Sequence, residues 1–150
     1  MKIFLDTSSL FKLYHEEEGT EEIEKVFSQA KITEIFLSEI AKVEFTSTIW
    51  KKVRTKEITV EQAEITLNLF ESDFPKYNFV TTDSLILERA RNLTTKYGVE
   101  GLRTLDSIQL STCLELINQS EVFYTADKLL KTLIEKEGLQ TRMLPSRDSI

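Results

Sequence analysis

Short, mainly apolar runs separated by helical patterns limit what this chain can fold into. Four such runs, residues 3–5, 35–37, 77–80 and 122–124, are typical of short buried strands. Segments with apolar residues at helical spacing lie between them, and residues 139–144 are a candidate fifth strand. Strands that alternate with helices predict an α/β fold with a mainly parallel sheet, covered by helices on both faces.

The expected helices cover residues 8–14, 20–30, 38–55, 59–72, 84–96, 104–118 and 128–137. Ser38 stands at a plausible N-cap position, Pro75 ends the fourth helix because it lacks a backbone N–H, and Gly138 ends the last one. The apolar residues expected in the core from the third helix are Ile40, Val43, Ile49, Trp50 and Val53.

Length and composition are those of one compact domain, which we expect to span residues 1–150. No apolar run approaches the roughly 20 residues that span a bilayer, and the N-terminus lacks the pattern of a signal peptide. Cys113, the single cysteine, cannot form an internal disulfide and lies on an apolar helical pattern. We therefore expect a cytoplasmic protein without a membrane segment, with Cys113 in its core.

The formal net charge of −6 argues against broad electrostatic binding of nucleic acid. It does not exclude an enzyme that gathers carboxylates in one pocket and keeps basic residues elsewhere. Two local groups of cations are candidates for such a basic patch, although most are expected on solvated helix faces: Lys51, Lys52, Arg54 and Lys56, and separately Arg89, Arg91, Lys96 and Arg103.

Three aspartates directly follow predicted strands and precede predicted helices. These are Asp6, Asp83 and Asp127. The carboxyl edge of a parallel sheet is where ligands bind in open α/β folds, so each could line a site. Each could equally be an N-cap that accepts hydrogen bonds from the following helix.

Two further acids stand within helical patterns. Asp106 begins a strongly apolar helix, where a favourable interaction with the helix N-terminus is the simpler interpretation. Glu44 lies in mid-helix between Val43 and Phe45, on or beside the apolar stripe. An ionised carboxylate is costly there unless something pairs with it.

A site emerges if Asp6, Glu44, Asp106 and Asp127 converge. Clustered carboxylates repel one another and hold protons more tightly, and a divalent cation relieves that repulsion. Oxygen ligands favour Mg²⁺ or Mn²⁺ over Zn²⁺. Such a cluster can orient and polarise a phosphodiester and help a water molecule to ionise.

At these residues the chain resembles PIN-domain proteins, and most closely the VapC toxins of type II toxin–antitoxin pairs. Four segments carry the resemblance in the family's order and spacing, and together they span nearly the whole chain: Ile3-Phe-Leu-Asp6-Thr-Ser-Ser-Leu, Leu37-Ser-Glu-Ile-Ala-Lys-Val-Glu44, Leu102-Arg-Thr-Leu-Asp106-Ser-Ile-Gln-Leu and Tyr124-Thr-Ala-Asp127-Lys-Leu-Leu.

The resemblance implies a three-layer α/β/α fold with strand order 3-2-1-4-5 and metal ligands at Asp6, Glu44, Asp106 and Asp127. Asp83 falls where the family has no ligand, and we interpret it as a helix cap. Strands 1 and 4 would be neighbours, so Asp6 and Asp127 would face one crevice. There Ser8 and Thr125 could hydrogen-bond the ligating carboxylates, or only nearby backbone.

Family members are commonly metal-dependent endoribonucleases, held silent by an antitoxin whose basic residue reaches the acidic pocket, and they commonly form homodimers through helices. We therefore expect an RNA substrate, an antitoxin partner and a homodimer. Phe45, Ile49 and Trp50 could serve such an interface, but core positions are the simpler expectation.

The single histidine, His15, bears on mechanism. Ribonucleases that use the ribose 2′-hydroxyl as nucleophile usually need a paired acid and base, so a metal-activated water that leaves 5′-phosphate and 3′-hydroxyl ends is the better hypothesis. Other phosphate chemistries fit less well. Ser8 replaces the second Asp of haloacid-dehalogenase-like phosphatases, Asp6 lacks the acidic neighbour of receiver domains, and no Gly-x-x-x-x-Gly-Lys loop is present.

A PIN-like binding scaffold with little or no turnover is the alternative function. The acidic net charge favours the scaffold, and retention of all four acids favours the enzyme. A metal-dependent ribonuclease assay on the wild type and Asp6→Asn separates them, since a scaffold has no cleavage to lose.

Overall fold

The computed structural model describes residues 1–146, and within them one five-stranded parallel sheet has the order β3-β2-β1-β4-β5. This confirms the α/β class and the strand order expected from the sequence. The strands are short, as the brief apolar runs predict: β1 (Lys2–Leu5), β2 (Glu34–Ser38), β3 (Asn78–Val80), β4 (Val122–Thr125) and β5 (Thr141–Met143).

Every predicted helix is present, with ends shifted by one to three residues. The first begins one residue early because Asp6 acts as its cap, and the Pro75 segment forms a short 3-10 turn, η1 (Phe74–Lys76). The α-helices are α1 (Thr7–Phe11), α2 (Thr20–Gln29), α3 (Ala41–Arg54), α4 (Val60–Ser72), α5 (Ser84–Tyr97), α6 (Thr104–Glu115) and α7 (Lys128–Lys136).

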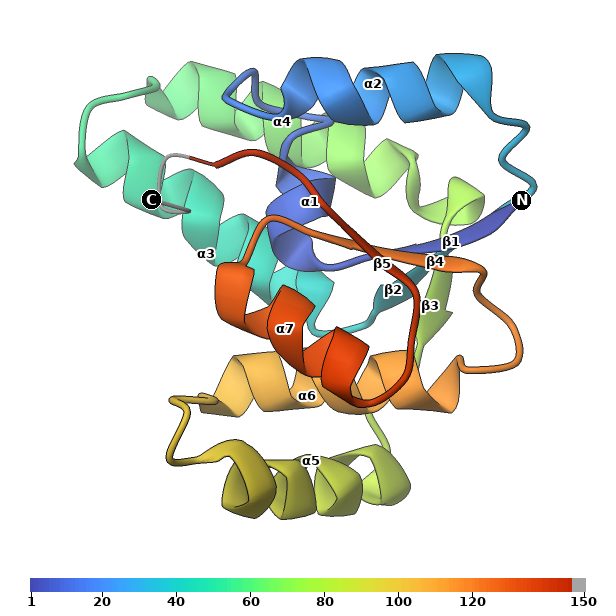
Figure 1. Ribbon diagram of the computed structural model, residues 1–150. Coiled ribbons are helices and arrows are strands. Elements are labelled where there is room, and N and C mark those ends of the chain that lie inside the picture. The colour runs from blue at the N-terminus through green and yellow to red at the C-terminus, as the bar shows by residue number, and fades with distance from the viewer. Residues whose placement is uncertain (147–150) are drawn as a thin grey trace.

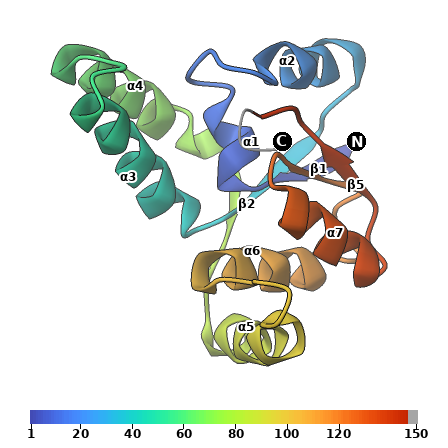
Figure 2. The same ribbon diagram turned by 60° about the vertical axis from the view of Figure 1, so that its left-hand side comes forward.

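Helices cover both faces of the sheet, which gives the three layers (Figures 1 and 2). Alternation along β1 explains the arrangement, because successive side chains of a strand point to opposite faces. Ile3 and Leu5 belong to the apolar core shared with α1, α2, α3 and α4, whereas Phe4 belongs to the core shared with α5, α6 and α7. Both cores are buried, as strands covered on two faces require.

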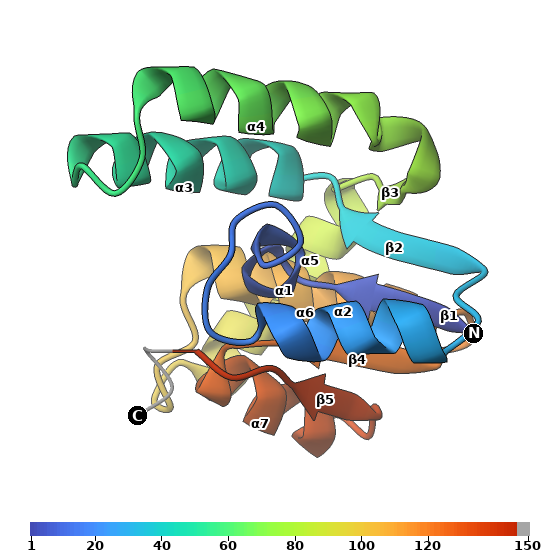
Figure 3. The ribbon, with the colours of Figure 1, turned by 90° about the horizontal axis from the view of Figure 1, so that it is seen from above.

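Helices α3 and α4 form a hairpin beside the β2–β3 edge of the sheet (Figure 3). Thr59 and Gln62 make a reciprocal capping box that starts α4, with Thr59 Oγ1 accepting from Gln62 N–H and Gln62 Oε1 accepting from Thr59 N–H. Phe45 of α3 and Phe70 of α4 pack with ring centroids 4.2 Å apart. These contacts pack α4 against α3, which extends from the carboxyl end of β2.

Two expectations for α3 are wrong. Val43 is 73% exposed rather than part of the core, because the helix turns Glu44 inward at that level. Ser38 is the last residue of β2 and the N-cap position belongs to Ile40, so Ser38 does not cap the helix.

Other predictions for the core are confirmed. Phe45, Ile49 and Cys113 are fully buried, and Trp50 is half-buried. Asp83 accepts a hydrogen bond from Ile86 N–H and caps α5, as expected. No helix within residues 1–146 is long and apolar enough to cross a membrane.

Candidate active site

Asp6 lies at the carboxyl end of β1, where the strand turns into α1. One of its carboxylate oxygens, Oδ1, accepts from Ser9 N–H at 2.9 Å, so the residue caps the helix. Ser8 Oγ donates to both carboxylate oxygens, at 2.8 and 2.9 Å, and Thr125 Oγ1 donates to Oδ2 at 2.6 Å. The two interpretations of Asp6 are therefore compatible: it caps α1 and also faces the crevice between β1 and β4.

Asp127 follows β4, the strand that pairs with β1. Its Oδ1 accepts from Leu130 N–H at 2.7 Å and caps α7, while its second carboxylate oxygen makes no hydrogen bond within residues 1–146. Ser8 Oγ accepts from Ala126 N–H at 3.0 Å, which ties the end of β4 to the start of α1. Asp6 and Asp127 therefore lie at the same edge of the sheet, the carboxyl ends of β1 and β4.

Glu44 reaches the same region from the first turn of α3. Its Oε1 accepts from Thr7 Oγ1 at 2.8 Å and from Gln109 Nε2 at 2.8 Å. These two donors satisfy the carboxylate that the sequence places beside an apolar stripe. The cost of turning an acid inward is offset by hydrogen bonds from α1 and α6.

Asp106 lies in the first turn of α6 and is half-buried. Its carboxylate makes no hydrogen bond to any residue that the structure describes. The helix N-terminus favours a negative charge there, as the sequence suggests, but does not supply a capping bond. Asp106 is therefore the acid of the four with the least support from its own neighbours.

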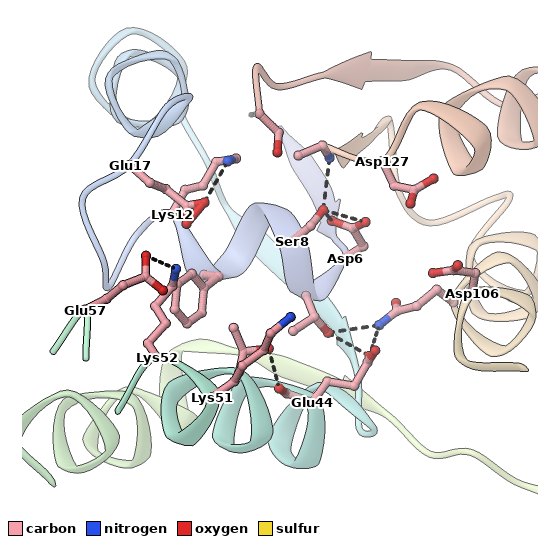
Figure 4. Close-up of a pocket in the computed structure, with 16 residues that line it drawn as sticks. Asp6, Ser8, Lys12, Glu17, Glu44, Lys51, Lys52, Glu57, Asp106 and Asp127 are labelled. Atoms are coloured by element: carbon pink, nitrogen blue, oxygen red, sulfur yellow. Dashed lines mark hydrogen bonds and ion pairs between the residues drawn. The ribbon is translucent and has the colours of Figure 1, made fainter. Parts of the chain in front are cut away.

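All four carboxylates line one pocket of about 440 Å³ at the carboxyl edge of the sheet (Figure 4). Four segments far apart in the sequence meet there, from β1, α3, α6 and the end of β4. The remaining residues that line the pocket are Thr7, Ser8, Phe11, Lys12, Glu17, Thr48, Lys51, Lys52, Glu57, Gln109, Ala126 and Ser146.

Burial raises the pKa of three of these acids, and repulsion from other carboxylates adds to the rise for Asp106 and Glu44. The pKa of Asp106 rises to about 6, through burial first and then through the charges of Asp127, Asp6 and Glu44, with Arg103 opposing. Burial also raises the pKa of Asp6, against hydrogen bonds from Thr125, Ser9 and Ser8. Burial raises the pKa of Glu44 despite its bonds to Gln109 and Thr7. The carboxylates are close enough to sense one another's charge.

The donor set fits a hard divalent cation. Carboxylate oxygens are the ligands that Mg²⁺ and Mn²⁺ prefer, and the raised pKa values mark negative charge that a cation would relieve. As arranged, however, no three His, Cys, Asp or Glu side chains within residues 1–146 form a ready-made set of metal ligands. The residues therefore fit such an ion by chemistry and by shared pocket, with Glu44 and Asp6 held by other side chains.

Sequence reasoning missed Gln109, which is 2% exposed and bonds both Glu44 and Thr7. A signal was present, because Gln109 follows Asp106 by three residues and so lies on the same face of α6. Lys12 was missed as well. It is 1% exposed, lines the pocket, and donates to Glu17 Oε2 at 3.1 Å and to the Glu18 carbonyl oxygen at 2.6 Å.

Known structures share this fold. FitAcB from Neisseria gonorrhoeae is similar with a TM-score of 0.69 and 12% identity, over 93% of this chain and 95% of that one. The sarcin-ricin loop cleaving toxin VapC20 of Mycobacterium tuberculosis has a TM-score of 0.67 and 13% identity, over 87% and 94% of the two chains. A toxin–antitoxin complex from Klebsiella pneumoniae has a TM-score of 0.60 and 18% identity, over 83% and 86%.

One curated protein, the human collagen alpha-1(XXI) chain, is 29% identical over 110 residues, which is 67% of this chain and 12% of that protein. The chain therefore spans about an eighth of that relative's length. A collagen triple helix needs glycine at every third residue, and this sequence has four glycines in 150 residues. The similarity carries no collagen-like architecture.

A family model described as "PIN domain" matches residues 3–135, which include all four carboxylates of the pocket. The strand order and the aspartates at the strand ends are those expected of a PIN domain, in agreement with this match. The chain belongs to the PIN-domain family.

Proposed function

We propose that the protein is a metal-dependent endoribonuclease that hydrolyses RNA phosphodiester bonds, and that it acts as the toxin of a toxin–antitoxin pair. The observation that carries the proposal is the meeting of Asp6, Glu44, Asp106 and Asp127 in one pocket with coupled charges. Membership of the PIN-domain family and likeness to VapC structures support a nuclease.

Asp6, Asp106 and Asp127 would hold Mg²⁺ or Mn²⁺, with Glu44 binding directly or through water. Such an ion supplies the positive charge that polarises a phosphodiester and favours ionisation of a water molecule. Ser8 and Thr125 fix the carboxylate plane of Asp6, and Gln109 and Thr7 fix Glu44. These hydrogen bonds hold the acids in place against their mutual repulsion.

No histidine is among the described residues that line the pocket, so the histidine pair that often serves the 2′-hydroxyl route is absent from that lining. His15 does not line it among the described residues, and its ring packs on Phe11 with centroids 5.3 Å apart. We therefore expect hydrolysis by water, with 5′-phosphate and 3′-hydroxyl products.

The test is cleavage of an end-labelled single-stranded RNA with Mn²⁺, with Mg²⁺ and with EDTA. We expect cleavage that needs the metal and is lost in Asp6→Asn and Asp106→Asn. The 5′-phosphate and 3′-hydroxyl ends left by hydrolysis with water ligate directly, whereas the ends left by the 2′-hydroxyl route ligate only after phosphatase and kinase treatment. Ends that carry a 2′,3′-cyclic phosphate would contradict hydrolysis by water.

A catalytically weak scaffold remains a second candidate, favoured by the lack of a ready-made ligand set within residues 1–146. Titration with Mn²⁺ followed by a ribonuclease assay on the wild type and Asp6→Asn separates the two candidates, because a scaffold shows no metal-dependent cleavage.

An antitoxin partner is a further part of the proposal. Six carboxylates and three ammonium groups line the pocket, so a basic side chain of a partner would be attracted to it. The solved toxin–antitoxin complex of similar fold supports this expectation. Co-purification with a protein encoded beside it, weakened by Asp106→Asn and Asp127→Asn together, would test it.

A further inference from the structure

The pocket has two ends of different charge. The four carboxylates named above gather at one end, whereas the three lysines that line the pocket extend toward the other, where Glu17 and Glu57 also lie (Figure 4). A nuclease pocket made of acids alone would repel the RNA backbone, because each phosphate carries a negative charge. The overall charge of −6 strengthens that repulsion, so any attraction must come from local cations.

Helix α3 links the two ends. Glu44, Thr48 and Lys51 all line the pocket, at spacings of four and three residues, and therefore share one face of the helix. Thr48 Oγ1 donates to the Glu44 carbonyl oxygen at 2.9 Å, so its hydroxyl proton is not donated to a charged side chain of the pocket. At 1.5 Å per residue, Lys51 stands about 10 Å along the helix from Glu44.

Two of the three lysines already have partners. Lys12 is buried against Glu17 and the Glu18 carbonyl, and Lys52 pairs with Glu57 at 3.5 Å. Lys51 makes neither an ion pair nor a side-chain hydrogen bond with any residue from 1 to 146. Figure 4 shows its ammonium group pointing into the pocket, between the acidic end and the paired lysines.

We propose that Lys51 binds a phosphate of the RNA backbone next to the scissile one, so that the substrate runs along α3 from the carboxylates toward Lys12 and Lys52. The inference rests on the proposed ribonuclease function. The distance along the helix separates Lys51 from the reacting phosphate, so its role is binding and positioning of the strand. A point charge on a flexible stem suits that role, because it holds a phosphate without reading the base.

The test is binding of a fluorescent single-stranded RNA to protein carrying Asp106→Asn, which prevents cleavage, measured across a range of salt concentrations with Mg²⁺ constant. Adding Lys51→Ala should weaken binding about three- to fivefold at low salt. It should also lower the slope of log K against log salt by about 0.7, the value for one phosphate contact on a single strand. Lys51→Arg should restore both.

Arg54→Ala is the matched control. Arg54 is exposed in the same last turn of α3 and does not line the pocket. Its replacement by alanine changes the net charge by the same amount as Lys51→Ala. It should leave the slope unchanged. In the cleaving enzyme, Lys51→Ala should raise KM for RNA with kcat nearly unchanged.

Equal slopes for Lys51→Ala, Arg54→Ala and their parent would overturn the inference, even if the wild type cleaves RNA. A wild type that neither binds nor cleaves RNA with Mg²⁺ or Mn²⁺ would overturn the proposed function first, so the two failures are distinct.

Discussion

Gln109 Nε2 lies 2.8 Å from Glu44 Oε1 and joins α6 to α3 across 65 residues of sequence. The same Nε2 donates to Thr7 Oγ1 at 3.2 Å, and Thr7 in turn donates to Glu44. A buried amide is costly unless its groups are paired. Here Nε2 is paired and fixes the direction of a carboxylate, whereas Oε1 has no hydrogen-bond partner among residues 1–146. Gln109 thereby acts on the proposed metal site without belonging to the set of acids.

Gln109→Leu should lower the affinity for Mn²⁺ about tenfold, because residues that orient metal ligands typically contribute that much. Loss of the amide donor also lets burial raise the pKa of Glu44 further, so binding of Mn²⁺ should shift to higher pH. Calorimetric titration at two pH values measures both effects. Thr112→Val is the control, since Thr112 is buried on the same helix and its hydroxyl donates only to the Ile108 carbonyl oxygen. Equal Mn²⁺ affinity in the two variants would contradict a role for Gln109 in orienting a metal ligand.

Local sequence predicts the fold and the positions of two of the acids, whereas Glu44 and Asp106 are expected in the site only from the resemblance to PIN-domain proteins. A strand that ends in Asp and turns into a helix places Asp6 or Asp127 at the sheet edge whatever the rest of the chain does. Asp83 shows the limit of that reasoning. It has the same local pattern and caps its helix in the same way, yet it follows β3 at the edge of the sheet, away from the β1–β4 crevice.

Glu44 and Val43 show why the rest required the structure. They follow Ile40 by four and three residues, so helical periodicity allows either to face inward. The choice depends on where α3 crosses the sheet and on the presence of Gln109 and Thr7, contacts that join distant segments. Pattern analysis therefore placed Val43 in the core, whereas the structure turns Glu44 into the pocket and leaves Val43 to solvent.

Asp106→Asn should stabilise the protein at pH 8 and have little effect at pH 4. The pKa of Asp106 is raised to about 6 in the folded state, so the unfolded chain loses this proton first as pH rises. The folded state therefore prefers the protonated carboxyl of Asp106, and the free energy of unfolding falls as the pH rises from about 4 through 6. Removing the charge with Asp106→Asn should raise the free energy of unfolding by about 1 kcal/mol at pH 8, after allowance for solvent screening.

Urea unfolding at both pH values measures this difference, and Asp83→Asn is its control. That substitution also removes one charge from a residue at a helix start, but outside the pocket. A gain in Asp83→Asn equal to that in Asp106→Asn would mean that net charge, not the cluster of carboxylates, causes the effect.

Mn²⁺ should raise the melting temperature of the wild type, because a ligand that binds only the folded state stabilises it. At a concentration 100 times Kd the gain is about 2.7 kcal/mol, or roughly 5–10 °C for a chain of this size. Asp106→Asn should lose most of the shift and Asp83→Asn should keep it. Differential scanning fluorimetry with and without EDTA measures it, and the absence of any shift in the wild type would count against a metal site at these acids.

Gly19→Ala should destabilise the protein more than Gly138→Ala, although both residues have positive φ, 96° and 87°. The left-handed backbone costs an alanine roughly 1–2 kcal/mol at either position. A Cβ on Gly19 would also clash with the Pro145 carbonyl oxygen and lie 2.9 Å from Lys12 Cδ, whereas nothing described lies within 4 Å of one on Gly138. Chemical unfolding of the two variants isolates the difference. Equal losses of stability in the two variants would show that the loop yields at Gly19 without strain on Lys12 or Pro145.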